Sequence, residues 1–167
     1  YVNKSSLPKV YGGFNTSLSW KGFDLSAIFA YSIGGYIYNR DITMILHNGS
    51  LEGRDWSTEI LKRWTPDNRN TDVPALSTTT NNWNSASTRF LQNNSYMRLK
   101  NLTLSYNLPK QWISKLSLSS VQVYVQGDNL FTIHRNQGLD PEQGITGITY
   151  YRYPAMRTIS GGINIAF

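Results

Sequence analysis

Hydrophobic and polar residues alternate along the first part of the chain. In residues 10–20 the large apolar side chains Phe14, Leu18 and Trp20 share one parity, and the positions between them are mostly polar. A period of two predicts a β-strand with one apolar face and one polar face. Residues 23–33 alternate in the same way after a two-residue connection that contains glycine. The pattern therefore predicts a β-hairpin.

The same alternation returns in the second half of the chain. It predicts three more strands, at about residues 96–108, 119–131 and 156–167. Each predicted strand is about eleven residues long, and a strand that crosses a membrane needs roughly 9 to 11 residues. The fold class expected from this pattern is all-β, with five antiparallel strands.

Short and long connections alternate between these strands. The long ones are residues 34–94 and 132–154. Transmembrane barrels have this arrangement, with short periplasmic turns and long extracellular loops. It predicts a periplasmic C-terminus and two extracellular loops. Within the first loop, residues 55–64 predict a short helix capped by Asp55.

Residues at the strand ends suggest where an apolar band would stop. Arg98 and Arg157 share the parity of the apolar residues of their strands, at the loop end. We expect both arginines at the outer headgroups, where lipopolysaccharide phosphates neutralise them. Trp20, Trp112 and Phe167 lie toward the opposite end, where aromatic rings prefer the membrane interface.

The composition fits alternating membrane strands better than a soluble globule. Charged residues make up 16% of the chain, against roughly 25% in an average soluble domain. The mean hydropathy is -0.40, and no run approaches the roughly 18 apolar residues of a spanning helix. There are no cysteines, which excludes disulfides and thiolate metal sites. No targeting signal is evident, and we expect the chain to be a piece of a longer protein.

The net charge of +6 does not indicate a nucleic-acid partner. Lysine and arginine occur as scattered single residues, whereas a nucleic-acid binder gathers them into a run or a helical stripe. We therefore predict no nucleic-acid binding.

Candidate catalytic and metal-binding residues are sparse. His47 and His134 have no serine or cysteine nucleophile motif beside them, so we interpret both as loop surface. Residues 67–72 offer carboxylate and amide oxygens, but they lack the central glycine and closing glutamate of a calcium loop and are typical of a turn. We predict no catalytic residue, no metal site and no cofactor.

Several polar side chains fall on the parity opposite to the apolar stripes. In a large barrel the inward positions are polar because they meet water or a plug. Two roles remain open for these positions, contact with a plug and contact with a substrate. The candidate lumen-facing residues are Asn15, Asp24, Gln122, Tyr124, Gln126 and Asp128.

Five segments, taken in order, resemble the C-terminal part of SusC/RagA-type TonB-dependent transporters of Bacteroidetes. They are "LPKVYGGFNTSLSWKGFDLSAIFAYSIGGYIYN", "RWTPDNRNTDVPAL", "STRFLQNNSYMRLKNLTLSYNLP", "VYVQGDNLFTIHRNQGLDPE" and "GGINIAF". The resemblance implies the last five strands of a 22-stranded outer-membrane barrel whose lumen is closed by a plug. The plug and the segment that contacts TonB are absent from this sequence.

The resemblance also implies a function and partners. The family imports large nutrients, often oligosaccharides or peptides, with a SusD-like surface lipoprotein as a lid and TonB as the source of energy. Trp56, Ile60 and Trp64 recur at steps of four, and this ridge either packs within the loop or contacts the lid.

The last strand resembles the outer-membrane signal that the barrel-assembly machinery reads. An unpaired apolar edge that ends in an aromatic residue suits capture by strand addition. The residues of this expected assembly signal are Gly161, Ile163, Ile165 and Phe167.

Two other classes of protein compete with a transporter. A soluble all-β carbohydrate-binding module would bury its apolar stripes against a second sheet. A small outer-membrane barrel enzyme would need at least eight strands and a nucleophile site, and the sequence offers neither. The environment of Leu104, Val123 and Ile163 discriminates between these classes, because only a sandwich encloses such residues in a protein interior.

Overall fold

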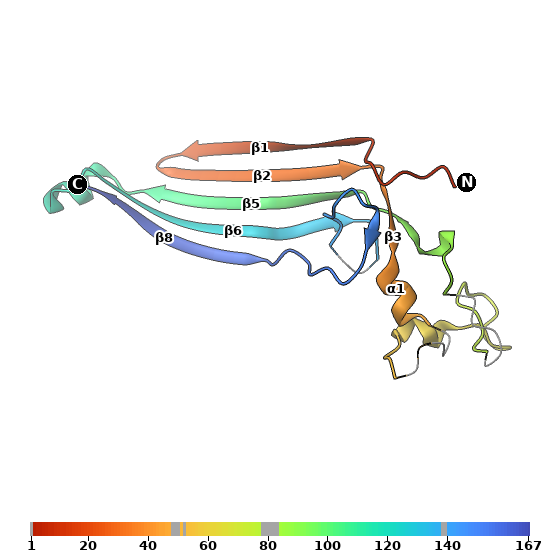
Figure 1. The fold of residues 1–167 in the computed structure, drawn as a ribbon. Helices are drawn as coiled ribbons and strands as arrows, with labels where there is room; N and C mark the ends of the chain where they lie inside the picture. The colour runs from red at the N-terminus through yellow and green to blue at the C-terminus, as the bar shows by residue number, and fades with distance from the viewer. Residues whose placement is uncertain (1, 48–50, 52, 78–83, 138–139) are drawn as a thin grey trace.

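The protein folds as one long antiparallel sheet with a compact group of loops at one end (Figure 1). The computed structural model describes residues 2–47, 51, 53–77, 84–137 and 140–167. Sequential strands are neighbours throughout the sheet, so the predicted five-stranded antiparallel arrangement is confirmed. The strands are β1 (Val10–Trp20), β2 (Phe23–Ile33), β5 (Tyr96–Asn107), β6 (Ser120–His134) and β8 (Thr158–Ala166).

The ends of two strands differ from those expected. β6 continues to His134, beyond residue 131, because it remains paired with β5 as far as Tyr96. β8 begins at Thr158, which pairs with Asp128. Pairing with the neighbouring strand thus determines where β6 ends and where β8 begins, whereas the alternation of apolar and polar residues becomes less regular near the loops.

The strand register places the apolar side chains on one face. Leu18 pairs with Leu25, Leu25 with Leu104, and Leu104 with Val125. Leu104, Val123 and Ile163 are 42%, 43% and 62% exposed. Within the described ranges, no second sheet is packed on this face, as a sandwich would require.

A β-bulge changes the phase of β5 at Lys100. The pairing with β2 passes from Ile28 opposite Asn101 to Phe29 opposite Leu99, so the register skips Lys100. Such a bulge re-aims the side chains that follow it. Arg98 therefore lies on the polar face, and the expectation that it lies with the apolar residues at the outer headgroups is wrong. The placement of Arg157 at those headgroups stays a prediction.

The long connections contain their own small sheet and buried core. The sheet has the order β4-β3-β7, formed by Leu91–Asn93, Tyr36–Asn39 and Ile148–Thr149. α1 (Arg40–Ile45), η1 (Thr58–Lys62) and η2 (Thr88–Phe90) lie around it. The buried apolar residues of this region are Ile37, Leu46, Ile60, Val73 and Phe90.

The helix expected at residues 55–64 is a single 3-10 turn. Its cap is Ser57, whose hydroxyl accepts a hydrogen bond from the Glu59 N–H, so Asp55 is not the cap. A 3-10 helix has three residues per turn, and side chains at steps of four do not align on it. Ile60 is buried whereas Trp56 and Trp64 are exposed, so the three do not form one ridge.

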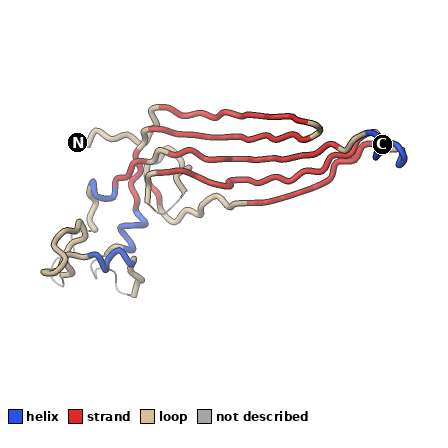
Figure 2. The backbone as a smooth tube through the Cα atoms, turned by 180° about the vertical axis from the view of Figure 1, so that it is seen from behind, coloured by secondary structure: helices blue, strands red, loops and turns tan. Residues whose placement is uncertain are grey.

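The end of the sheet opposite the long loops carries tight connections (Figure 2). Lys21 and Gly22 both have a positive φ, as a type I′ hairpin turn requires. β5 and β6 are joined by α2 (Lys110–Ile113) and η3 (Ser114–Leu116).

Within the described parts of the chain, no helix combines the length and the apolar character that a membrane-crossing helix requires.

Candidate functional site

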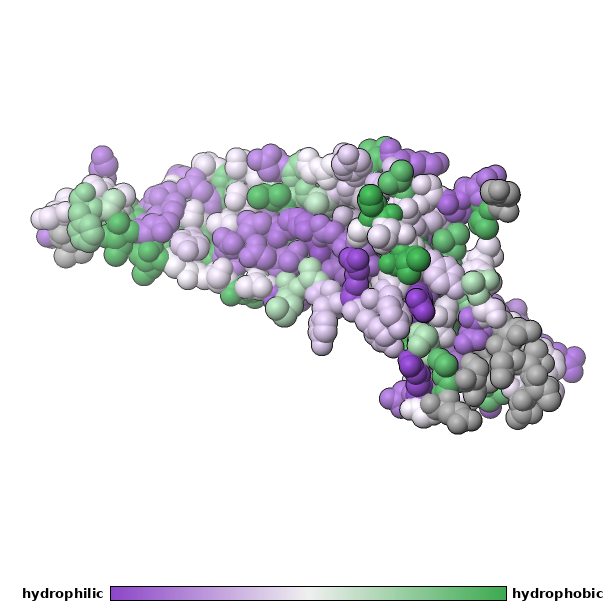
Figure 3. All heavy atoms as spheres, in the orientation of Figure 1, coloured by the Kyte–Doolittle hydropathy of each residue, from purple (hydrophilic) through white to green (hydrophobic). Residues whose placement is uncertain are grey.

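The polar face carries a row of side-chain hydrogen bonds that crosses all five strands. Hydrophilic residues gather along the middle of the sheet on the face turned to the viewer in Figure 3. Asp24 accepts hydrogen bonds from the Ser19 hydroxyl and from Asn107, the latter at 2.7 Å. Gln122 donates to Asn107 over 3.1 Å and accepts from Asn164 over 3.1 Å. The row ties neighbouring strands together through their side chains as well as their backbones.

A second polar group surrounds Asp128, closer to the loops. One carboxylate oxygen accepts from Asn101 at 2.7 Å and the other from Gln126 at 3.3 Å. Thr103 donates to the side-chain oxygen of Asn101. Both carboxylates of this face, Asp24 and Asp128, therefore have partners on both oxygens.

The structure brings four of the six predicted lumen-facing residues into these two groups, namely Asp24, Gln122, Gln126 and Asp128. Asn15 lies exposed on β1, opposite Ile28. Tyr124 lies over Gly162, where an added Cβ would come within 2.7 Å of the tyrosine hydroxyl. The role of all six as plug or substrate contacts stays a prediction.

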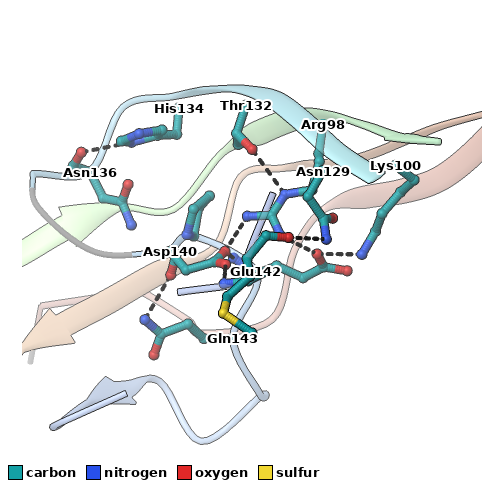
Figure 4. Close-up of polar contacts among 12 residues, drawn as sticks. Arg98, Lys100, Asn129, Thr132, His134, Asn136, Asp140, Glu142 and Gln143 are labelled. Carbon is teal, nitrogen blue, oxygen red and sulfur yellow. Dashed lines mark hydrogen bonds and ion pairs between the residues drawn. The ribbon is translucent and has the colours of Figure 1, made fainter. Parts of the chain in front are cut away.

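A buried ion cluster joins the sheet to the second long loop (Figure 4). The Arg98 guanidinium binds the Asp140 carboxylate through Nη2 and Glu142 Oε2 through Nη1, the latter at 2.9 Å. Its Nε donates to the Thr132 hydroxyl over 2.9 Å. Lys100 binds the same oxygen of Glu142 at 2.6 Å. The Arg98 and Asp140 side chains are only 4% and 8% exposed.

Asp140 also binds the backbone of its own loop. Its carboxylate accepts from the N–H of Glu142 at 2.9 Å and from the N–H of Ala155 at 2.6 Å. Burial by itself raises the pKa of Asp140, but the hydrogen bonds from Arg98 and from these two N–H groups outweigh it, so the pKa lies below its ordinary value. The carboxylate is therefore charged at neutral pH and connects three separate parts of the chain.

The two long loops interlock beside this cluster. β3 and β7 pair in parallel, with Tyr38 opposite Ile148. The Asn94 amide donates to the Pro141 carbonyl at 2.8 Å. On the other side, the Tyr151 N–H donates to the Asp41 carboxylate at 2.9 Å. The loops form one folded unit through backbone and side-chain contacts.

A pocket of about 820 Å³ lies between α1 and the returning part of the second loop. One wall comes from α1 and the other from the segment around Tyr151 and Tyr153. Arg54 donates to the Tyr151 hydroxyl over 3.2 Å. The pocket is lined by Asn39, Asp41, Ile42, Met44, Ile45, Gly53, Arg54, Asp55, Gln137, Tyr151, Arg152, Tyr153 and Pro154.

The histidines differ from each other. His47 is only 1% exposed and meets Trp56 edge to face at 5.3 Å between ring centres, so its interpretation as loop surface is wrong. The neighbouring Trp56 ring covers it, a tertiary contact that a single-residue argument misses. His134 is exposed, with Nδ1 2.9 Å from the Asn136 carbonyl oxygen.

The polar residues at 67–72 form a turn. Asn68 donates to the carbonyls of Lys62 and Arg63, at 3.0 and 3.2 Å. Thr71 donates to the same Lys62 carbonyl at 2.6 Å. Among the residues that the structure describes, no group of three or more histidine, cysteine, aspartate or glutamate side chains has the arrangement of a metal site.

Comparison with known proteins relates these features to a family. No established family profile matches the sequence. The chain is 35% identical to TonB-dependent receptor P3 of Formosa agariphila, over 93% of this chain and 16% of that protein. It is 27% identical to TonB-dependent receptor SusC of Bacteroides thetaiotaomicron, over 100% of this chain and 16% of that protein.

Solved structures agree with the sequence comparison. The structure of the RagAB peptide transporter matches 99% of this chain with a TM-score of 0.87 and 35% identity. These matches support a fragment of a SusC/RagA-type TonB-dependent transporter. The chain spans only 18% of the RagAB chain that it matches, so the sheet is one section of a TonB-dependent barrel.

The sheet edge formed by β8 suits a section of a larger barrel. Within the described residues, β8 pairs with β6 along one edge only. Ile163 and Ile165 are exposed on it, as is most of the strand, and Phe167 is exposed directly after its end. Gly161 pairs with Val125. The assignment of these residues as an assembly signal remains a prediction.

Sequence reasoning missed the ion cluster at the loop end. Asp140 and Glu142 were not recognised as partners of Arg98, because Arg98 was assigned to the wrong face. The sequence did contain a clue to this cluster. The second loop has two acidic residues and β5 has two basic ones, and charges of this kind must be paired if they are buried. Only the bulge at Lys100 shows that they meet.

Proposed function

We propose that the chain is the C-terminal part of the barrel of an outer-membrane importer that takes up nutrients with energy from TonB. The observation that carries this proposal is the exposed apolar face across all five strands. A monomeric soluble protein rarely exposes an apolar patch larger than a few hundred Å². Contact with lipid hydrocarbon removes the free-energy penalty of exposing this face to water, which supports a membrane environment for it.

The polar face then borders the lumen. Its side chains hydrogen-bond to one another, so the carboxylates of Asp24 and Asp128 have hydrogen-bond partners without any water. Asn15, Tyr124 and the exposed parts of the rows are available to a plug or to a passing substrate. The wall binds and guides cargo without reacting with it, so we propose no enzymatic activity.

The two ends of the sheet support one orientation. The hairpin turn, α2 and the C-terminus share one end, and the long loops share the other (Figure 2). Transmembrane barrels have short turns on the periplasmic side. We infer a periplasmic C-terminus, with the ion cluster and the pocket at the extracellular mouth, near lipopolysaccharide.

Relatives suggest the cargo and the partners. One similar structure is described as a peptide importer, and another relative is named SusC. We propose that the whole protein imports oligosaccharides or peptides under a SusD-like lipoprotein lid. Trp56 and Trp64, both exposed at the loop end, are candidate contacts for that lid, whereas the buried Ile60 packs within the loop.

The assembly role of the last strand follows from its free edge. The barrel-assembly machinery is proposed to pair with β8 until the rest of the barrel does so. Phe167→Ser is expected to lower the level of the transporter in the outer membrane. Normal levels of a heat-modifiable band would argue against this role.

The full-length protein tests the main proposal directly. We expect it to fractionate with the outer membrane, to need detergent for extraction, and to migrate differently on gels before and after heating. Deleting its gene should abolish growth on the cargo, and growth on peptides and on oligosaccharides, each as sole carbon source, identifies which is carried. Solubility without detergent would favour the carbohydrate-binding module instead.

A further inference from the structure

We propose that Arg98 and Asp140 form a latch that fixes residues 140–155 against the polar face, and that releasing it removes the Tyr151–Pro154 wall of the pocket while the α1 wall stays in place. Asp140 is then a positioning residue, and the Tyr151–Pro154 wall is the part of the mouth that moves, a property separate from import itself.

The latch acts at both ends of the segment that it holds. Asp140 binds the N–H of Glu142 near the beginning and the N–H of Ala155 at the end. Arg98, on β5, anchors the same carboxylate to the sheet. The Asp140 side chain thus joins the two ends of the segment and attaches them to the sheet. Its removal therefore affects the whole segment.

The Tyr151–Pro154 wall depends on this closure. It lies directly before Ala155, the residue whose N–H the latch holds. The Tyr151 N–H also donates to Asp41, and Arg54 donates to the Tyr151 hydroxyl at the surface. Just before the wall, Thr149 pairs with Asn39 of β3 and the Arg40 guanidinium lies over the Tyr150 ring. The contacts of the wall residues themselves lie at the surface, and they hold less firmly than a buried charge pair with four further bonds.

The α1 wall has support of its own. Asn39 caps the helix by accepting from the Ile42 N–H at 3.1 Å. The Ile45 carbonyl accepts from the Ser57 N–H at 2.8 Å, which ties α1 to the segment before η1. Leu46 and Ile60, buried beside them, belong to the loop core. None of these contacts involves Arg98 or Asp140, so this wall should survive release of the latch.

The bulge at Lys100 makes the latch possible. Without it, the alternation of β5 would direct Arg98 to the apolar face, away from Asp140. Lys100 itself binds Glu142, so the bulge places both cations on one side. The cluster then balances two basic groups against two acidic ones, which lowers the cost of burying Arg98.

Hydrogen exchange of the folded full-length transporter tests the latch. In Asp140→Asn, peptides that cover 148–157 are expected to exchange on the order of a hundredfold faster, because the buried guanidinium loses its main counter-charge. Peptides that cover 40–47 should keep the rate of the natural protein. Glu59→Gln, which breaks the exposed pair with Lys62, is the matched control and should change neither region.

Two results would overturn the proposal. Unchanged exchange at 148–157 would show that the latch does not hold this segment, and equal acceleration at 40–47 would show that the walls move together. If Asp140→Asn does not assemble, Thr132→Val removes only the hydrogen bond to Arg98 Nε and should give a smaller acceleration confined to 148–157. The heat-modifiable gel band reports membrane folding separately, so failure of the transporter assignment is distinguishable from failure of the latch.

Discussion

The sheet and the loop end of this protein are stabilised in opposite ways. The sheet is a single layer whose apolar residues, such as Leu18 and Ile163, remain exposed. The loop end has a small core of its own, where Ile37 and Phe90 are almost fully buried. In the proposed barrel the sheet depends on surrounding hydrocarbon and neighbouring strands, whereas the loop end folds as a water-soluble protein does, by burying apolar groups and pairing charges.

The polar groups follow the same division. On the sheet, amides and hydroxyls bond in rows along an open face, as between Gln122 and Asn164. At the loop end, charges are removed from water and paired, as in Arg98 with Asp140. The comparison implies that charge changes matter most where a charge is buried in a pair or faces hydrocarbon, and least where the side chain is exposed to water.

The largest effect is expected from Arg98→Ala. Removing one partner of a buried ion pair leaves uncompensated charge and costs about 3–5 kcal/mol. Reversible unfolding of the transporter in detergent measures this loss. A double-mutant cycle with Asp140→Ala should show strong coupling, because one interaction is removed in both variants. Additive losses would mean that the two side chains stabilise the protein independently.

A lysine on the apolar face should have the next largest effect. Val123→Lys places a charge against hydrocarbon; the cost is about 2–4 kcal/mol at the bilayer middle and is lower here, because Val123 pairs near the hairpin end of the sheet. Gln122→Lys is the matched control on the adjacent position of the same strand and should cost far less, because it faces the polar side. Unfolding in lipid vesicles distinguishes the two. Equal losses would remove the difference between the faces.

Acid should weaken the loop end before the sheet. The pKa of Asp140 lies below its ordinary value in the folded protein, so the carboxylate contributes stability above the pKa of the unfolded chain. That contribution is lost as the pH falls through the folded pKa, in the range below ordinary carboxyl values. Hydrogen exchange in the 148–157 region, corrected for intrinsic pH dependence, should rise there. The Asp140→Asn variant should lack this rise.

The smallest effect is expected from Glu59→Gln. The Glu59 carboxylate lies 2.8 Å from Lys62 Nζ, but the side chains are 51% and 66% exposed. Exposed pairs contribute about 0.2–1 kcal/mol at most and are screened by salt. Unfolding measured at low and high salt should differ little from the natural protein. A loss comparable with Arg98→Ala would contradict the view that burial decides the strength of these pairs.

Alternation alone predicted most of the sheet. A period of two needs only neighbouring residues, so Leu18 and Leu104 were placed on one face before any pairing was known. The same reasoning placed Gln122 and Asp128 on the other face. It failed at Arg98, because a bulge is decided by how two strands align and leaves no period of its own.

The loop end was far less predictable. Residues 34–94 showed no sustained period, so β3, α1 and the small sheet were not foreseen. His47 is buried only because Trp56 folds over it, and Asp140 meets Arg98 only because both loops return to the same end of the sheet.

The sequence by itself determined the five strands of the main sheet, their two faces and the resemblance to a transporter family, since these depend on local alternation and on motifs read in order. The tertiary structure alone decided which charges are paired and which wall of the pocket is fastened. Contacts between residues far apart in the chain depend on strand register and loop closure, and neither leaves a repeating signal in the sequence.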